Sequence, residues 1–155
     1  MAGPAAAESL HIRPVERADR PQWGRMWSGY LAFYKTELPE GMYDLAFDRL
    51  LSGTAGEFSG LIATLGGKTV GLVHYLFHRH GWRQDQVCYL QDLYTDPAAR
   101  GQGVGAALIN AVYAEADKAG APSVYWLTQE GNETARKLYD RIATETDFIK
   151  YQRSL

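Results

Sequence analysis

The order of apolar and polar positions divides the chain into short segments that alternate between strand-like and helical periods. Strands are predicted over 10–15, 58–65, 69–78, 87–95, 123–128 and 148–152, where apolar residues alternate with polar ones or run together. Apolar residues at helical spacing predict helices over 20–34, 43–51, 104–119 and 132–139. The expected order is a strand, two helices, an antiparallel meander, and then two helix-strand repeats.

Turn and cap residues support these boundaries. Asp19 can cap the first helix, Gly66-Gly67 is a two-residue hairpin signal, and Gly120 is suited to stop the third helix. Because that third helix separates strands 87–95 and 123–128, the two strands are expected to run parallel as a strand-helix-strand unit.

Composition limits the class of protein. The 155 residues fit one domain over 10–155, preceded by a flexible tail over 1–9. Sixteen basic and eighteen acidic residues argue against nucleic acid or an anionic membrane as the main partner. The single Cys88 is expected to pack as a small apolar side chain, which suits a reducing compartment. No apolar run or basic leader points to a membrane span or a signal peptide, so a cytoplasmic location is expected.

The most informative stretch is the glycine-rich entry into the third helix. Glycines at 101, 103 and 105 allow tight turns and leave main-chain N–H groups uncovered. The first N–H groups of a helix lack internal partners, and the helix dipole places partial positive charge there. Arg100 adds a full charge. This arrangement predicts a phosphate-binding loop, rather than a glycine-rich helix start without a ligand.

Two common phosphate-binding patterns fit poorly. Gly101, Gly103 and Ala106 satisfy the dinucleotide pattern G-x-G-x-x-G/A, but the motif lies late in the chain and no acidic residue follows at the expected distance. A P-loop would need Gly-Lys-Ser/Thr after the glycines, and that sequence is absent.

The loop instead resembles the Q/R-x-x-G-x-G/A signature of the Gcn5-related N-acetyltransferases (GNAT), matched by Arg100, Gly103 and Gly105. The resemblance implies an α/β fold with a mixed, mostly antiparallel sheet, a central parallel βαβ unit and flanking helices. It also implies acetyl-coenzyme A as the cofactor, with its pyrophosphate held by main-chain N–H groups.

A second motif supports the same family. Asn132, Ala135, Leu138 and Tyr139 match a helix that in this family contacts the pantetheine arm and places a tyrosine hydroxyl near the thioester sulfur. A phenol there is a plausible general acid for the leaving thiolate, although an isolated half-buried tyrosine is just as often structural. Later segments and the Trp27–Tyr34 helix resemble the Hpa2-type and polyamine acetyltransferases, but Asp147 stands where the family usually has glycine.

The resemblance assigns roles residue by residue. The Leu93 N–H would stabilise the oxyanion while an amine attacks the thioester directly in a ternary complex, without a covalent nucleophile. The residues expected to hold the cofactor are Leu93, Tyr94, Thr95, Arg100, Gly101, Gln102, Gly103, Val104, Gly105, Ala106, Asn132, Ala135 and Tyr139.

The residues that bind the amine substrate and take its proton are harder to assign. Polyamine-type relatives carry glutamate where this chain has Gln91, and an amide accepts no proton. Asp92 points to the opposite face of a regular strand, although a bulge would change that, so a catalytic or substrate-ammonium role stands level with a structural one. Tyr30, Tyr34 and Glu37 are the other expected substrate contacts. His74, His78 and His80 share a strand face, but a metal site is not predicted from them.

The sequence therefore predicts an acetyl-CoA-dependent N-acetyltransferase acting on a small primary amine such as a polyamine, diamine or amino acid. A lysine or amino-terminal group of a peptide is the alternative acceptor, and a non-catalytic acyl-CoA binding module is the non-enzyme alternative. Relatives of this type are often dimers, and 148–151 could serve as an exchanged or abutting edge strand. The acceptor, the general base and the oligomeric state stay open.

Overall fold

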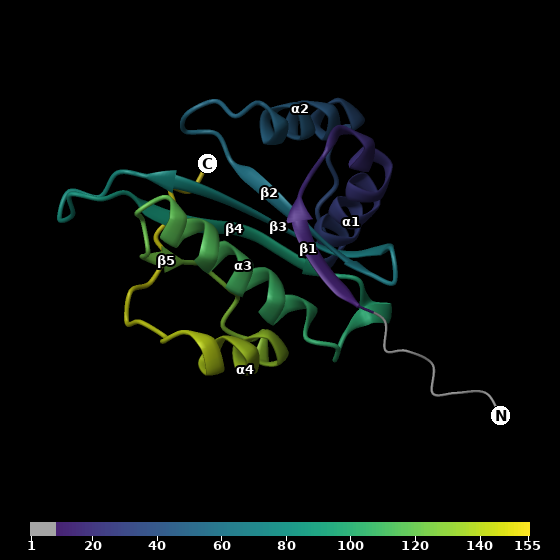
Figure 1. The fold of residues 1–155 in the computed structure, drawn as a ribbon. Coiled ribbons are helices and arrows are strands. Elements are labelled where there is room, and N and C mark those ends of the chain that lie inside the picture. Colours follow the sequence, from purple (N-terminus) through teal and green to yellow (C-terminus); the bar gives the residue numbers. More distant parts are fainter. Residues whose placement is uncertain (1–8) are drawn as a thin grey trace.

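A computed structural model describes residues 9–155 of the chain, so most of the tail predicted over 1–9 lies outside the described residues. Five strands, four α-helices and two short 3₁₀ turns follow one another along this part of the chain (Figure 1). In chain order they are β1 (Leu10–Pro14), η1 (Arg17–Asp19), α1 (Arg20–Phe33), α2 (Glu40–Leu51), β2 (Ser59–Leu65), β3 (Lys68–His78), β4 (Val87–Thr95), η2 (Pro97–Ala99), α3 (Val104–Lys118), β5 (Val124–Tyr125) and α4 (Glu133–Ile142).

The strands form one sheet in the order β1-β2-β3-β4-β5. The first three pairs are antiparallel and β4 pairs with β5 in parallel, which confirms the expected mixed sheet and its βαβ unit. The hairpin at Gly66-Gly67 is also confirmed, because both residues have positive φ, at 58° and 80°. Two-residue hairpin turns of this kind favour glycine for that reason.

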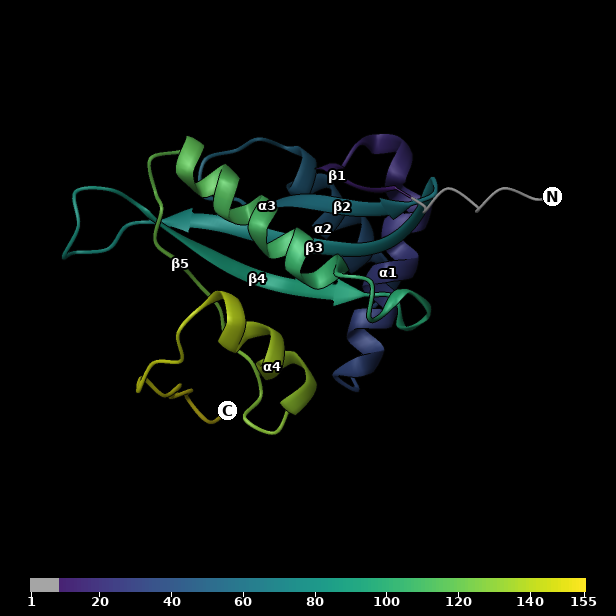
Figure 2. The same ribbon diagram turned by 60° about the horizontal axis from the view of Figure 1, so that its bottom comes forward.

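Helices cover both faces of the sheet. Helices α1 and α2 pack on one face, α3 crosses the other, and α4 lies beside α3 next to the β4–β5 side of the sheet (Figure 2). The core under α3 contains Leu108, Ile109 and Val112, each 0 % exposed, as the helical spacing predicted. The core on the other face is centred on Trp23, also 0 % exposed, and on Phe47 of α2.

The C-terminal strand expected over 148–152 is wrong. Residues 146–155 form neither helix nor strand, and Phe148, Ile149 and Tyr151 are 81 %, 76 % and 89 % exposed. The strand expected over 123–128 is reduced to the two residues of β5. A strand needs a neighbouring backbone to bond with, and β5 pairs with β4 at only two positions. The apolar pattern of the C-terminal segment therefore finds no sheet edge in this chain.

The prediction that the Asp19 side chain caps the first helix is also wrong. Asp19 precedes α1, but its carboxylate makes no cap hydrogen bond to that helix. Instead it accepts two hydrogen bonds from the Arg13 guanidinium, each of 2.8 Å, and one from the Glu16 N–H at 2.7 Å. The Arg13 hydrogen bonds hold the pKa of Asp19 below its ordinary value. This ion pair ties β1 to the start of α1.

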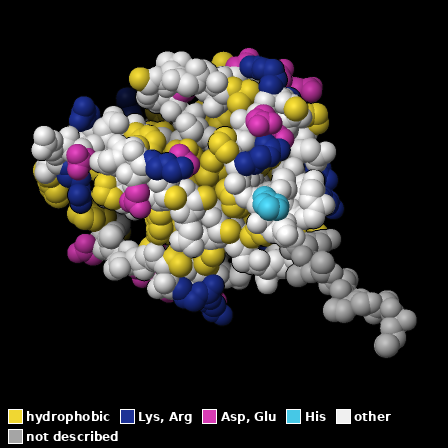
Figure 3. All heavy atoms as spheres, in the orientation of Figure 1, with side chains coloured by type: hydrophobic (Ala, Val, Ile, Leu, Met, Phe, Trp, Pro, Cys, Tyr) yellow, Lys and Arg dark blue, Asp and Glu magenta, His cyan; other side chains and the backbone are white. Residues whose placement is uncertain are grey.

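On the face drawn in Figure 3, basic and acidic side chains of both signs are interspersed among apolar ones. Within residues 9–155, no helix has both the length and the apolar character needed to cross a bilayer.

Candidate active site

A β-bulge in β4 decides which way its polar residues face. In the pairing of β3 with β4, His74 lies opposite Asp92 and Tyr75 lies opposite Leu90, so Gln91 is the extra residue. In a regular strand Leu90 and Asp92 would share a face. The bulge breaks that alternation: Leu90 packs in the core under α3, while Asp92 turns to the face covered by α1.

Asp92 is enclosed by α1 and β3. One oxygen, Oδ1, accepts a hydrogen bond of 2.6 Å from the Tyr30 hydroxyl, and Oδ2 lies 3.0 Å from His74 Nδ1. Its side chain is 11 % exposed, and in the described part of the chain no Lys or Arg forms an ion pair with it. Asp92 is therefore an almost buried carboxylate held by the Tyr30 hydroxyl and the His74 ring.

The charge of this carboxylate affects three tyrosines. Burial raises the pKa of Tyr30 well above its ordinary value, with the charge of Asp92 adding to the effect. Burial and Asp92 also raise the pKa of Tyr34, and burial with Tyr125 and Asp92 raises that of Tyr89. Tyrosine rings around a carboxylate can face a cation with both their π surfaces and the negative charge.

The loop before α3 has the shape that the sequence predicted. Gly101 and Gly103 both have φ of 78°, in the left-handed region that favours glycine. The first main-chain bond into the helix runs from the Ala107 N–H to the Gly103 carbonyl at 3.0 Å, so the N–H groups at 104–106 come before it. Those donors are free of helical partners at the positive end of the helix dipole.

The same loop is tightly fitted to α4. A Cβ at Gly105 would lie 3.1 Å from Leu138 Cδ2, so glycine lets the start of α3 approach α4 closely. Arg100 and Gln102 are exposed beside it, whereas the Val104 side chain is 2 % exposed and belongs to the core. Val104 can therefore contact a ligand through its main chain but not through its side chain.

Between the loop and the bulge, the second half of β4 has a free side. Parallel pairing with β5 covers only Cys88 and Tyr89, so 90–95 have no described strand partner on the β5 side. Leu93 and Thr95, the expected main-chain contacts of the cofactor, lie in this stretch, and Tyr94 packs its ring toward α1. The ring approaches Gly29 so closely that a Cβ there would collide with its hydroxyl oxygen.

Tyr139 reaches this region from α4. Its ring packs edge-on against Trp126 with a centroid distance of 5.3 Å, and burial raises its pKa to about 12, with a smaller effect from Tyr34. The phenol therefore holds its proton at neutral pH. Asn132 caps α4, accepting a hydrogen bond of 3.5 Å from the Ala135 N–H.

Comparison with known proteins identifies the family. The profile of the Acetyltransferase (GNAT) family matches residues 23–143. The chain belongs to this family. It is also 36 % identical, over 148 residues, to the D-amino-acid N-acetyltransferase HPA3 of Saccharomyces cerevisiae, covering 95 % of this chain and 92 % of that protein. An acetyltransferase of the GNAT family is thus confirmed.

Solved structures agree on the fold. The aminoglycoside acetyltransferase AAC(6')-Iy, in complex with the bisubstrate analogue CoA-S-monomethyl-acetylneamine, superposes with a TM-score of 0.82 at 18 % identity, covering 95 % of this chain and 99 % of that one. The ribosomal-protein-alanine N-acetyltransferase from Brucella melitensis biovar Abortus 2308 gives a TM-score of 0.78 at 22 % identity, covering 95 % of this chain and 100 % of that one. These structures confirm the expected GNAT fold.

Not every residue predicted to bind the substrate of this GNAT protein lies near Asp92. Tyr30, Tyr34 and Asp92 come together, but Glu37 is exposed in the segment between α1 and α2, and Gln91 is exposed at the bulge. The histidines do not form one group either. His74 lies against Asp92, whereas His78 is hydrogen-bonded to the Tyr125 hydroxyl at 2.7 Å. Among the described residues, no group of His, Cys, Asp and Glu is placed to hold a metal ion.

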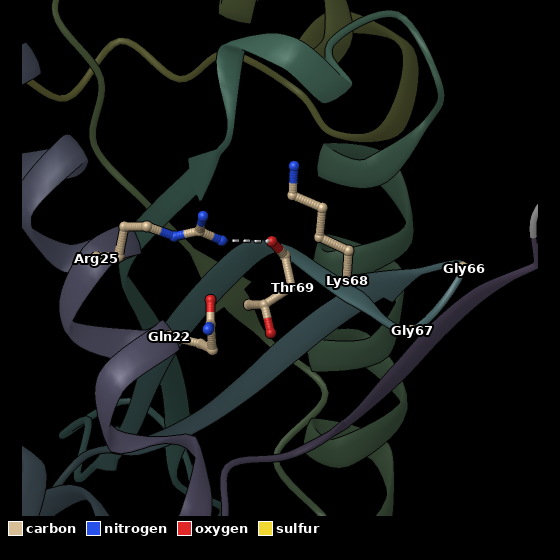
Figure 4. Close-up of a pocket in the computed structure, with 6 residues that line it drawn as sticks. All are labelled: Gln22, Arg25, Gly66, Gly67, Lys68 and Thr69. Atoms are coloured by element: carbon tan, nitrogen blue, oxygen red, sulfur yellow. Dashed lines mark hydrogen bonds between the residues drawn. The ribbon is translucent and has the colours of Figure 1, made fainter.

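A separate surface cavity lies elsewhere in this GNAT domain. Its volume is about 420 Å³, and Figure 4 shows it between α1 and the β2–β3 turn. The lining residues are Gln22, Arg25, Gly66, Gly67, Lys68 and Thr69. None of the predicted site residues borders it. The candidate site is therefore made of Asp92 with its neighbours Tyr30 and His74, and of the loop over 100–106.

Sequence reasoning missed His74 as a contact of Asp92 and Trp23 as the partner of His74. The bond between the Trp23 and His74 rings joins residues 51 positions apart, and no local spacing indicates it. One signal was available: His74 lies in the middle of an apolar strand, and a buried histidine must find partners for its ring nitrogens.

Proposed function

We propose that this GNAT protein transfers the acetyl group of acetyl-coenzyme A directly to the primary amine of a small molecule. The observation that carries the acceptor class is the Asp92 carboxylate, which is 11 % exposed, accepts a hydrogen bond from Tyr30 and forms no ion pair with a Lys or Arg among the described residues. Burying a negative charge is costly unless it is paired. A substrate ammonium would complete the site.

The free amides of the loop support coenzyme A as the cofactor. They are suited to its pyrophosphate, and Arg100 adds positive charge at the same place. The pantetheine arm would lie along the free side of β4, where Leu93 and Thr95 offer main-chain groups. Solved relatives of this fold hold coenzyme A or a bisubstrate analogue of it, according to their descriptions.

The reaction needs three contributions from the chain. Asp92 binds the incoming ammonium, which releases one proton to solvent water and so frees its nitrogen lone pair for attack on the thioester carbon. A second proton leaves the nitrogen as the amide forms, and it balances the proton that the departing thiolate takes up. The Leu93 N–H stabilises the oxyanion that forms on the thioester oxygen. As the carbon–sulfur bond breaks, the protonated Tyr139 hydroxyl donates a hydrogen bond or its proton to the departing thiolate. Holding both substrates in one complex supplies much of the rate through proximity.

The name of the yeast relative makes D-amino acids the first acceptors to test. Thiol release from acetyl-coenzyme A is measured with D-alanine, L-alanine, putrescine, spermidine and a lysine-containing peptide. We expect release with at least one small amine and little with the peptide. Release with the peptide alone would instead assign a protein-directed activity. Coenzyme A binding without release for any amine would favour a binding module.

We also propose that two copies associate through the C-terminal segment. Phe148, Ile149 and Tyr151 are exposed, and β5 offers two residues at the end of the sheet with no further described strand beside them. A second copy packed against this segment would bury these side chains. Light scattering after size-exclusion chromatography is expected to give the mass of a dimer, and Ile149→Glu to give a monomer. A monomeric wild type would refute the proposal.

A further inference from the structure

His74 is bonded at both nitrogens of its ring, although it is buried in the middle of a strand. It is 1 % exposed, with Nε2 lying 3.0 Å from Trp23 Nε1 and Nδ1 lying 3.0 Å from Asp92 Oδ2. An indole N–H only donates, so Nε2 of His74 must be the acceptor. The ring proton therefore sits on Nδ1 and points at Asp92.

The contacts form a chain that leaves α1, crosses β3 and β4, and returns to α1. The Trp23 ring is 0 % exposed and lies at one end, in the core between α1 and α2. At the other end, the Tyr30 hydroxyl donates to the second carboxylate oxygen at 2.6 Å. Each oxygen of Asp92 thus receives one hydrogen bond from an uncharged donor, and the plane of the carboxylate is set from both sides.

We propose that Trp23 and His74 are positioning residues for the acceptor amine, which rests on the proposed role of Asp92 as the ammonium site. The His74 N–H fixes the carboxylate without bringing a positive charge. Trp23 occupies the Nε2 lone pair, so that a second proton on His74 would cost the Trp23 hydrogen bond and leave two N–H groups facing each other. A doubly protonated imidazole would neutralise Asp92 and repel an ammonium. The pair therefore keeps the negative charge available to the substrate.

The tautomer can be read directly from nitrogen NMR of the free protein, without any acceptor. We expect His74 to show a protonated Nδ1 and an unprotonated Nε2 at neutral pH. Trp23→Phe removes the indole donor and is expected to change the Nε2 resonance. Trp27→Phe is the matched control, because the neighbouring Trp27 indole N–H is buried without a hydrogen-bond partner. A proton on Nε2 in the wild type would overturn the proposal.

Kinetics with D-alanine and putrescine test the positioning role. His74→Leu removes the N–H, whereas His74→Asn retains a donor at about the reach of Nδ1. A hydrogen bond to a charged group is worth enough to raise the KM for the amine about tenfold in His74→Leu. The KM for acetyl-coenzyme A should stay unchanged, and His74→Asn should restore most of the loss. Equal increases in both KM values, or no rescue by Asn, would reduce His74 to a structural residue.

A double-mutant cycle separates this inference from the proposed function. In an Asp92→Asn background, His74→Leu should raise the KM for the amine no further, because the carboxylate that His74 positions is already gone. Additive effects would refute the coupling. If the wild type acetylates neither amine, the proposed function fails for these acceptors, and the NMR tautomer still decides whether Trp23 and His74 hold Asp92 as described.

Discussion

Two substitutions of the glycine at the start of α3 should rank in opposite order for stability and for cofactor affinity. Gly103→Ala should lose more stability, and Gly103→Asp should lose more affinity for coenzyme A. Gly103 has φ of 78°, and a Cβ there would meet nothing within 4 Å. Gly103→Ala therefore brings backbone strain but no collision. An L-residue in the left-handed region costs about 1–2 kcal/mol, which for a chain of this size lowers Tm by about 2–8 °C.

Gly103→Asp changes the balance between the two effects. Aspartate tolerates the left-handed region better than alanine, so the loss of stability should be smaller. Its carboxylate, however, would stand beside the bound pyrophosphate. Two unit charges about 4 Å apart repel by about 4 kcal/mol at an effective dielectric constant near 20, which corresponds to roughly a thousandfold loss of affinity. Gly103→Ala, which adds no charge, should bind coenzyme A far better than Gly103→Asp.

Gly53 provides the matched control. It follows α2 with φ of 64°, and a Cβ there also meets nothing within 4 Å. Gly53→Ala and Gly53→Asp should each lower Tm about as much as the same substitution at Gly103, but they should leave the affinity for coenzyme A unchanged. Thermal denaturation and titration calorimetry with coenzyme A measure the two quantities, and added salt should shrink only the deficit of Gly103→Asp. The reasoning is refuted if Gly103→Asp binds coenzyme A as tightly as Gly53→Asp does.

Three further predictions concern the acid, the core and the ion pair at β1. Tyr139→Phe should lower kcat by about a hundredfold or more while changing coenzyme A affinity little; because the pKa of Tyr139 is raised to about 12, the wild-type rate should show no loss from its ionisation up to about pH 10. A comparable fall in affinity would contradict its role as the acid. Gly71→Ala should cost about 1–3 kcal/mol in thermal unfolding, because its Cβ would lie 2.9 Å from a backbone oxygen of β4, whereas Gly81→Ala meets nothing and should be neutral. The pKa of Asp19 is lowered below 3.8 by hydrogen bonding to Arg13, so its contribution is present above the unfolded pKa and is lost as pH falls. The Tm difference between wild type and Arg13→Leu should therefore shrink as the pH is lowered below the ordinary value of 3.8, and a difference that stays constant would point to packing instead.

Much of the fold follows from local pattern. The apolar face of α3 predicted burial of Leu108, Ile109 and Val112, and all three are fully buried. The paired glycines at 66 and 67 predicted a hairpin because two successive residues with positive φ are rarely anything else. The positive φ of Gly101 and Gly103 follows from the same preference of glycine. In each case the requirement is met by the backbone or by one face of a single element.

The pattern failed where an element depends on a neighbour. The segment 148–152 alternates like a strand, but β5 is too short to pair with it. Asp19 is a residue type that commonly caps helices, yet its carboxylate accepts two hydrogen bonds from the Arg13 guanidinium, six residues earlier on β1. Both outcomes were settled by competition for hydrogen-bond partners that local spacing does not reveal.

The sequence by itself determined the alternation of strands and helices, the turn at 66–67 and the loop whose amides are left free before α3, because periodicity and backbone conformation are local properties. Only the tertiary structure decided the acceptor side of the site. One extra residue in the β3–β4 pairing turns Asp92 toward α1, where Tyr30 and His74 meet it. Trp23 joins them across 51 positions of sequence. Register and long-range contacts arise when the elements pack together, and no single segment carries them.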